Sequence, residues 1–302
     1  MILTAAIFLP VLGAVLVGLI PRRQEAAIKG TALLATLATA AVGVKLLVDF
    51  DYSASEKLQF EVAHNWIEVI NSRYHIGIDG ISLPLLILSI VITVLCVVYS
   101  WDHFPEPHNP KAFLILMLIL ETGMVGTFAA QDLILFFVFF ELVLLPMYFM
   151  IGVWGGPNRQ YASIKFFLYT LFGSAIMILS FLALYFKAGH TFDIPELIAQ
   201  GGTIGRSTQI LIFGGLFMGF AIKVPMFPFH TWLPDAHTEA PTVGSVILAA
   251  VLLKLGTYGF VRVALPILPE AARAWAPVIG ALAVIGIIYG ALGCLAQTDM
   301  KR

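Results

Sequence analysis

Four ionisable residues lie near the middle of apolar segments that are long enough to cross a bilayer: Glu121, Glu141, Lys223 and Lys254. A charge at the bilayer centre costs about 2.5 to 3.5 kcal/mol, so four uncompensated charges would consume roughly the whole stability of an ordinary fold. These side chains must therefore be paired, hydrated or protonated. For either acid, the alternative to a functional role is a protonated carboxyl group that hydrogen-bonds a neighbouring helix.

Two prolines closely follow Lys223. Pro225 and Pro228 lack an N–H group, so the carbonyls of Ala221 and Val224 lose their helical donors and the helix is predicted to break there. Free carbonyls at membrane depth are tolerated only inside protein or beside water. This indicates a hydrated cavity beside a discontinuous helix, as in many transporters, and not contact with lipid. A simple proline kink is the alternative.

Small residues precede Lys223 on the same predicted helix. Gly215 and Gly219 lie at four-residue intervals before it, which would let another helix approach the lysine closely. Glu141 is the predicted partner. An ion pair at about 4 Å contributes roughly 4 kcal/mol at an effective dielectric constant of 20, so separating the pair would allow the lysine to lose its proton.

Lys254 and two histidines are further candidates for proton transfer. Lys254 is predicted to be a second protonatable site on an intact helix, the alternative being a side chain that extends to the interface. His230 and His237 lie in the segment that joins the two lysine helices, and would either pass protons between the cytoplasm and the cavity or order the loop by hydrogen bonds. Their spacing with Asp235 and Glu239 matches no known metal pattern, so no metal site is predicted.

The composition is that of an integral membrane protein. Of 302 residues, 60% are apolar and 12% are charged, and the mean hydropathy is +0.94. The net charge of −1 provides no basic surface for nucleic acid. Cys96 and Cys294 lie in separate apolar runs with no second thiol or histidine at ligand spacing, so neither a disulfide nor a metal clip is predicted.

Nine apolar runs of about 18 or more residues are long enough to span a bilayer. They cover residues 2–20, 26–48, 78–100, 112–130, 133–154, 164–186, 209–229, 243–264 and 275–296. The first run has no positive charge ahead of it and is followed by Arg22 and Arg23, so it is predicted to be an uncleaved span and not a signal peptide. The fold class predicted is an all-α integral membrane protein, a polytopic bundle of about nine spans.

Basic residues on alternate loops predict the orientation. The amino terminus is predicted to lie outside and the end at residue 302 in the cytoplasm. The basic residues on the predicted cytoplasmic side are Arg22, Arg23, Lys29, Lys111, Arg159, Lys301 and Arg302. Two outer segments, 49–75 and 187–208, are long enough for structure of their own. In the second, Asp193 is predicted to cap a short helix that has Pro195 in its first turn, and neither segment is predicted to carry chemistry.

Long motifs resemble one known family. They are FFELVLLPMY at residues 139–148, KVPMFPFHTWLPDAH at 223–237, YHIGIDGIS at 74–82 and KLGTYG at 254–259. Together they resemble chain M, an antiporter-like membrane subunit of proton-pumping NADH-quinone oxidoreductase, respiratory complex I. Subunits of cation/proton antiporters and of membrane-bound hydrogenases are the alternative, but Pro146 and the run HTEAPT at 237–242 are closer to chain M.

The resemblance implies a fold of fourteen helices with two inverted five-helix repeats. The family's channel glutamate then falls on Glu141, its broken-helix lysine on Lys223 and its next central lysine on Lys254, while Glu121 matches an acid of the fourth span. It implies a non-redox subunit for proton transport in the inner or plasma membrane, with no catalytic, cofactor-binding or metal-binding residues of its own. NADH, FMN, iron–sulfur clusters and quinone are implied in partner subunits, and neighbouring antiporter-like subunits and the lipid bilayer are the implied partners.

The sequence departs from the family pattern at its carboxyl end, where relatives continue into a second repeat. We therefore expect a fragment or one part of a split subunit. The regions expected are a three-span region at 1–111, a first five-helix repeat at 112–264 and the first helix of a second repeat at 265–302. A different class of function is also open, in which the chain is a structural spacer and its charges are struts between helices.

Overall fold

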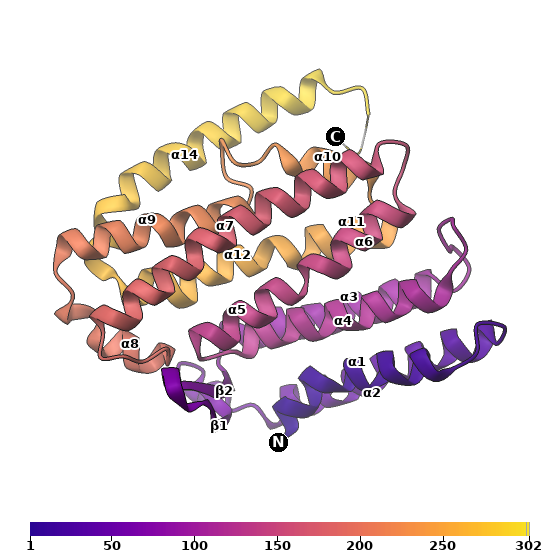
Figure 1. Cartoon of the computed structure of the whole chain (residues 1–302), viewed down its shortest axis with the longest axis horizontal. Helices are drawn as coiled ribbons and strands as arrows, with labels where there is room; N and C mark the ends of the chain where they lie inside the picture. The colour runs from indigo at the N-terminus through magenta and orange to yellow at the C-terminus, as the bar shows by residue number, and fades with distance from the viewer. Residues whose placement is uncertain (300, 302) are drawn as a thin grey trace.

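The computed structural model describes residues 1–299 and 301. The axes of its long helices lie roughly along one line, and consecutive helices are joined by turns at alternate ends (Figure 1). Within these residues, eight helical segments are long and apolar enough to cross a membrane. They are α1 (Ile2–Leu19), α2 (Glu25–Asp49), α3 (Ser82–Tyr99), α4 (Pro110–Ala129), α5 and α6 together (Leu133–Trp154), α7 (Arg159–Lys187), the segment Thr242–Ile267, and α14 (Pro269–Ala296). The predicted helical membrane bundle is confirmed.

The predicted span at residues 209–229 ends earlier than expected. Helix α9 (Arg206–Lys223) ends at Lys223 and does not continue to residue 229. The N–H groups that Pro225 and Pro228 lack are those that would have extended the helix. The predicted break is therefore confirmed, and the chain resumes as the short helix α10 (Trp232–Glu239).

Two other spans depart from regular α-helix geometry. Helix α5 (Leu133–Leu142) gives way to α6 (Leu144–Trp154) at Val143, because Pro146 has no N–H for the carbonyl of Leu142. The segment that carries Lys254 is one continuous helix, as predicted, but it contains two π-helical turns. It consists of α11 (Thr242–Ile247), a π-helical turn η4 (Leu248–Leu252), α12 (Leu253–Gly259), a second π-helical turn η5 (Phe260–Ala264) and α13 (Leu265–Ile267). Few helices contain π-helical turns, and those turns often lie at functional sites.

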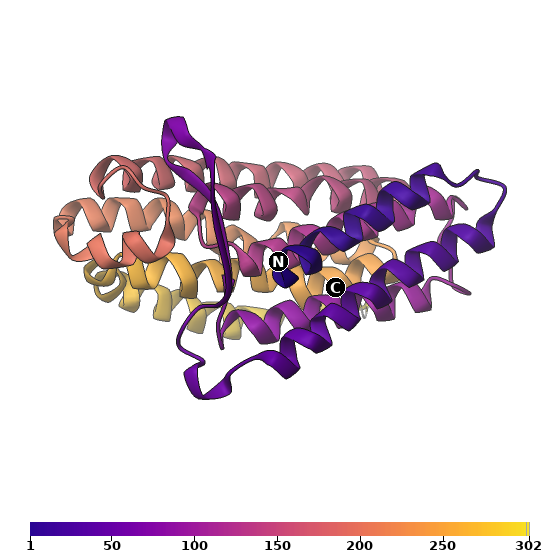
Figure 2. The same cartoon turned by 90° about the horizontal axis from the view of Figure 1, so that it is seen from below.

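A β-hairpin, which the sequence analysis did not predict, lies across the ends of α4 and α5 (Figure 2). Strand β1 (Gln59–Ile67) pairs antiparallel with β2 (Ser72–Ile78), with short 3₁₀ turns at Tyr52–Ala54 and Glu68–Ile70. The backbone of β2 also bonds the turn between α4 and α5, since the N–H of Gln131 donates to the carbonyl of His75 at 2.9 Å. The hairpin is thus fixed to the helix bundle.

Polar side chains cap the helices at this end. Asp132 accepts hydrogen bonds from the N–H groups of Ile134 and Leu135 at the start of α5. Asp193 accepts from Glu196 N–H at the start of α8 (Ile194–Gln200), as predicted, and Pro195 lies in its first turn. A 3₁₀ turn at Gly201–Thr203 then leads into α9.

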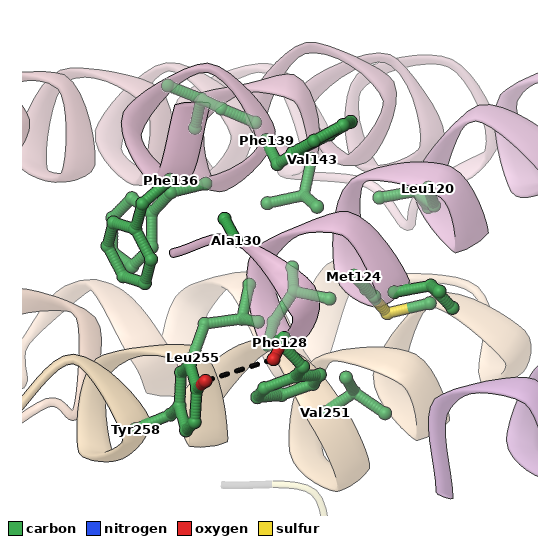
Figure 3. Close-up of a cluster of buried hydrophobic side chains, with 14 of the residues drawn as sticks. Leu120, Met124, Phe128, Ala130, Phe136, Phe139, Val143, Val251, Leu255 and Tyr258 are labelled. Carbon is green, nitrogen blue, oxygen red and sulfur yellow. Dashed lines mark hydrogen bonds between the residues drawn. The ribbon is translucent and has the colours of Figure 1, made fainter. Parts of the chain in front are cut away.

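Helix α4 is the centre of the bundle, with 78% of its most apolar window buried, whereas the corresponding window of α14 is unburied. Figure 3 shows side chains of α4, α5 and the Lys254 segment in one apolar cluster, where the hydroxyl of Tyr258 donates to the carbonyl of Phe128 at 2.9 Å. Gly126 allows this packing, because a Cβ there would lie 2.4 Å from the ring of Phe139. The core therefore holds α4, α5 and α12 at fixed separations.

Candidate functional site

Lys223 is the most enclosed cation of the bundle. Its side chain is 2% exposed at the last residue of α9, and its Nζ lies 4.8 Å from the centre of the Phe140 ring. Among the described protein atoms, Nζ has no hydrogen-bond partner. A ring face attracts a cation electrostatically, but it does not replace the hydrogen bonds of an ammonium group.

The backbone around Lys223 retains only part of its hydrogen bonding. The carbonyl of Ala221 accepts from Met226 N–H at 2.9 Å, one residue later than in a regular helix. The carbonyl of Ile222 accepts from the indole N–H of Trp232 at 2.9 Å. Trp232 thus joins α10 to the broken end of α9, which fixes the lysine at the break.

Glu141 lies on the last turn of α5, next to Phe140. Its carboxylate accepts a short hydrogen bond from the Ser174 hydroxyl of α7. Among the described residues, no ion pair within 4.0 Å joins it to Lys223, although the two groups are near enough to interact electrostatically. In this conformation Glu141 thus binds Ser174 and Lys223 lies against the Phe140 ring, so the direct contact expected from the sequence is not made.

The glycine stripe before Lys223 does allow a close approach, but the approaching helix is α7 and not the helix of Glu141. A Cβ at Gly215 would lie 2.1 Å from Ser180 Oγ, and one at Gly219 would lie 2.7 Å from Met177 Cβ and 3.1 Å from the carbonyl oxygen of Gly173. Ser174 lies on this face of α7. The stripe therefore brings the hydroxyl that binds Glu141 next to the lysine helix.

Replacing Gly219 by Leu should force α9 away from α7, because the backbone carbonyl of Gly173 cannot move out of the way. Overpacking of this kind costs about 1 to 3 kcal/mol, and we expect a lower melting temperature of the detergent-solubilised protein. Gly280→Leu on α14 is the control, since a Cβ there has no neighbour within 4 Å. Equal melting temperatures for the two variants would contradict the close approach.

The helix that carries Lys254 packs close to Lys223, but the side chain of Lys254 points away from it, to the surface of this chain. A Cβ at Gly256 would lie 3.0 Å from Lys223 Cβ, so α12 packs directly on the end of α9. The side chain of Lys254 itself is exposed on this chain, and its Nζ donates to the carbonyl of Ala249 at 2.6 Å. The two lysines therefore occupy adjoining helices on different faces.

The two candidate histidines occupy the segment after the break. His230 stacks on Phe227 and meets Tyr289 edge-on, with ring centres 5.7 and 5.1 Å apart, and it lines a cavity of about 510 Å³ between this segment and α14. Asp235 also lines the cavity and pairs with Lys165 of α7 at 2.7 Å. His237 lies on α10, where burial and then the charge of Lys301 lower the pKa of its imidazole.

Glu121 is completely buried on α4. Neither of its carboxylate oxygens has a hydrogen-bond partner among the described protein atoms. The structure therefore does not bring it into contact with Glu141, Lys223 or Lys254, and it lies at the centre of the bundle and not at the break in α9.

The sequence analysis missed a buried ion pair on the hairpin side of the bundle. Arg262 Nη2 lies 2.6 Å from Asp79 Oδ1, with side-chain exposures of 12% and 8%, and Arg262 Nε donates to the hydroxyl of Tyr258 at 3.1 Å. Burial opposes the charge of Asp79, but Arg262 and neighbouring backbone N–H groups outweigh it and lower the pKa of the carboxyl group. Arg262 was a visible signal, as the second charged residue, besides Lys254, inside the apolar run 243–264.

A second missed cluster fixes the hairpin. His75 on β2 is buried between two acids, with its Nδ1 2.5 Å from Asp193 and its Nε2 2.9 Å from Glu61. Burial disfavours the charged imidazole, but the hydrogen bonds and charges of Asp193 and then Glu61 prevail and raise its pKa. Asp132 accepts from Ser72 Oγ and Arg73 N–H in the same place. The prediction that these outer segments carry no chemistry overlooked this cluster.

The raised pKa of His75 predicts a pH-dependent attachment of the hairpin. The attraction is complete below the unfolded pKa of about 6.5 and is lost as the pH rises through the higher folded pKa. We expect the protection factors of residues 59–78, which correct exchange for its intrinsic dependence on pH, to fall across that interval. His75→Gln should remove this fall, whereas His64→Gln on the exposed face of β1 should keep it. Protection factors that do not change with pH in the unmodified protein would contradict the role of His75.

The fold and the site define a polytopic α-helical membrane protein with ionisable groups buried in its spans. Residues 130–302 match the family model described as NADH:quinone oxidoreductase/Mrp antiporter, TM. Residues 58–127 match that of the amino terminus of NADH-ubiquinone oxidoreductase chain 4. The chain belongs to the NADH:quinone oxidoreductase/Mrp antiporter transmembrane family.

Individual relatives agree with this assignment. NADH-quinone oxidoreductase subunit M of Rickettsia typhi is 41% identical in an alignment of 307 residues. The alignment covers 100% of this chain and 61% of the relative. NADH-ubiquinone oxidoreductase chain 4 of Arabidopsis thaliana is 42% identical over 301 residues, 99% of this chain and 60% of the relative. This chain thus spans about 60% of the length of these curated relatives.

Solved structures share the fold. A chain of respiratory complex I from Thermus thermophilus superposes with a TM-score of 0.86 at 28% identity, over 100% of this chain and 60% of that chain. A chain of an archaeal membrane-bound sulfane sulfur reductase superposes with a TM-score of 0.88 at 20% identity, over 99% of this chain and 60% of that chain. The second likeness concerns the fold alone.

Proposed function

We propose that this chain is a proton-translocating membrane-arm subunit of NADH-quinone oxidoreductase, in which Glu141 and Lys223 form a half-channel. One observation carries the proposal. A partly buried carboxylate on α5 and a buried ammonium group on α9 interact electrostatically at a broken helix. Among the described residues neither is held in an ion pair, since Glu141 accepts from the Ser174 hydroxyl and Lys223 lies against the Phe140 ring.

The proton step follows from the distance between these two groups. An approaching carboxylate stabilises the ammonium form of Lys223. At about 4 Å and an effective dielectric constant of 20 the attraction is roughly 4 kcal/mol, about a thousandfold in proton affinity. When Glu141 returns to Ser174, this attraction falls and Lys223 releases its proton. Quinone reduction elsewhere in the complex is proposed to drive the change in spacing.

Further groups would complete the path. We propose that Lys223 exchanges protons with Lys254 on the adjoining helix, where π-helical turns flank the lysine. His230 and His237 would connect Lys223 with the cytoplasm through the cavity lined by His230 and Asp235, and Glu121 would be an additional buried acid on α4. This path requires only side chains that gain and lose protons.

The proposal also concerns the surroundings of the chain. We place it in the inner or plasma membrane with its amino terminus outside, next to other antiporter-like subunits of the complex. NADH, FMN, iron–sulfur clusters and quinone would be bound by partner subunits. The names of the relatives of this chain support this assignment.

Lys254→Ala tests the proposed path with little risk to the fold, because the lysine is exposed on this chain. In sealed vesicles that contain the assembled complex, NADH-driven proton uptake should fall about tenfold. This is a smaller loss than the roughly hundredfold or more that a positioned general acid or base contributes in an enzyme. Blue-native gels should show an unchanged amount of complex. Lys45→Ala on α2 is the control, since its ion pair with Asp49 is exposed and contributes little.

Other results would point to the alternatives. Unchanged ratios of protons to electrons in Lys254→Ala would contradict the path through this residue. Loss of assembled complex in proportion to proton uptake would indicate a structural spacer. Sodium-dependent proton exchange in the absence of NADH would indicate a cation/proton antiporter, the other activity in the description of the family.

A further inference from the structure

Two cavities meet at the end of α3 that is remote from the hairpin. One has a volume of about 460 Å³ and lies between the turns that follow α3, α6 and α10. The other has a volume of about 290 Å³ and runs along the side of α3 against α11. Tyr99, Thr242 and Val243 line both cavities. The two cavities therefore adjoin at these residues.

The two parts of this site differ in polarity. The groove along α3 is lined by apolar side chains, among them Ile92, Leu95 and Val246. Leu95 is 56% and Val246 is 40% exposed, so the groove opens to the side of the bundle. Ile92 to Tyr99 spans roughly 10 Å along the helix axis. The groove is thus an apolar channel parallel to the helices, as an acyl chain in a bilayer would require.

The larger cavity is polar and lies where α3 ends. His103 stacks on Tyr99, with ring centres 4.8 Å apart, and Tyr side chains are typical of the membrane–water interface. Lys301 lines the cavity, and its Nζ donates to the carbonyl of Ala240 at 3.2 Å. A cation at this level can bind a phosphate group.

A carboxylate faces the same cavity. Glu239 lines it, and its Oε2 accepts the N–H of Asn158 at 2.9 Å, which leaves its second oxygen for another donor. An ammonium group with N–H donors can hydrogen-bond this oxygen, whereas a trimethylammonium group cannot.

We propose that this site binds one phospholipid with a primary ammonium headgroup, of the phosphatidylethanolamine class. One acyl chain occupies the groove along α3. The phosphate lies at Lys301 and the ammonium group at Glu239. The cation and the anion among the described lining residues match a zwitterionic headgroup, and Glu239 disfavours a headgroup with only negative charge.

Photocrosslinking tests the proposal in the complex that contains the full chain. Phosphatidylethanolamine, phosphatidylcholine and phosphatidylglycerol, each with a diazirine in one acyl chain, are exchanged into the complex, and labelled peptides are mapped by mass spectrometry. Phosphatidylethanolamine should label residues 92–99 and 242–246 about fivefold more than either other lipid, as expected for one partly exposed charged contact of about 1 kcal/mol. Equal labelling by the three lipids would reduce the site to non-specific bilayer lipid and overturn the proposal.

Two variants separate the groove from the headgroup pocket. Leu95→Trp fills the groove and should lower labelling about fivefold, whereas Val98→Trp, on the same helix and 52% exposed, should leave it unchanged. Glu239→Gln keeps an acceptor for Asn158 but removes the charge, so labelling by phosphatidylglycerol should rise to that by phosphatidylethanolamine. Identical results for Leu95→Trp and Val98→Trp, or an unchanged lipid preference in Glu239→Gln, would refute the site.

Discussion

Lys223→Ala is expected to lower NADH-driven proton uptake by at least about tenfold while NADH oxidation with an artificial electron acceptor continues. Its ammonium group is 2% exposed and lies between the Phe140 ring and the broken end of α9. In the proposed function this is the group whose proton affinity the Glu141 carboxylate changes. Glu141→Gln should have the same effect, because the amide still accepts from Ser174 but has no charge to attract the ammonium.

Lys223→Arg distinguishes a proton carrier from a strut. Arginine keeps the positive charge, but it does not release a proton in proteins. A carrier role therefore predicts that Lys223→Arg loses proton uptake as Lys223→Ala does, with the complex still assembled on a blue-native gel. A purely structural role predicts that Arg restores what Ala removes. Lys45→Arg on the exposed pair of α2 is the matched control and should be indistinguishable from the unmodified protein.

Asp79→Asn is expected to have the largest effect on stability. It leaves the buried guanidinium of Arg262 without its counter-ion, which costs about 3 to 5 kcal/mol. The melting temperature of the solubilised protein should fall accordingly. Asp49→Asn removes an exposed partner of Lys45 and should cost about 1 kcal/mol or less.

The double variant Asp79→Asn with Arg262→Met tests the reason for this loss. The asparagine keeps an acceptor for the N–H groups of Ile81 and Ser82, and with the guanidinium removed no buried charge is left uncompensated, so much of the stability should return. If the double variant were as unstable as Asp79→Asn, packing and not an uncompensated charge would be responsible.

The pair between Asp79 and Arg262 also predicts a dependence on pH. Burial opposes ionisation of Asp79, but Arg262 and the backbone donors lower its pKa overall. The contribution of the pair is therefore complete above the unfolded pKa of about 3.9 and is lost as the pH falls through the lower folded value. Asp79→Asn should lack this part of the acid dependence.

Local chemistry explains why several features could be predicted from the sequence. The break after Lys223 follows from two missing N–H groups, and the cap at Asp193 follows from a short acceptor ahead of a proline in the first turn. The close approach at Gly219 follows from the absence of a side chain. Each of these depends on a few neighbouring residues, so one sequence contains the information.

Features that depend on distant segments were missed or misjudged. The hydrogen bond from Ser174 of α7 to Glu141 was not expected, because nothing in the sequence of α7 marks Ser174 as a donor to this acid. The clusters around His75 and Arg262 join segments 118 and 183 residues apart. The π-helical turns around Lys254 depend on packing that no local propensity predicts.

The sequence by itself determined that this is a membrane protein of the antiporter-like class, with its ionisable residues in defined spans, because apolar length and long motifs are local properties of the chain. Only the tertiary structure decided which of these residues meet. Contacts between helices depend on rotation and separation in three dimensions, and small residues such as Gly219 and Gly256 set that separation. Glu141 therefore binds Ser174, and Lys223 contacts the Phe140 ring, although their charges alone predicted a direct pair.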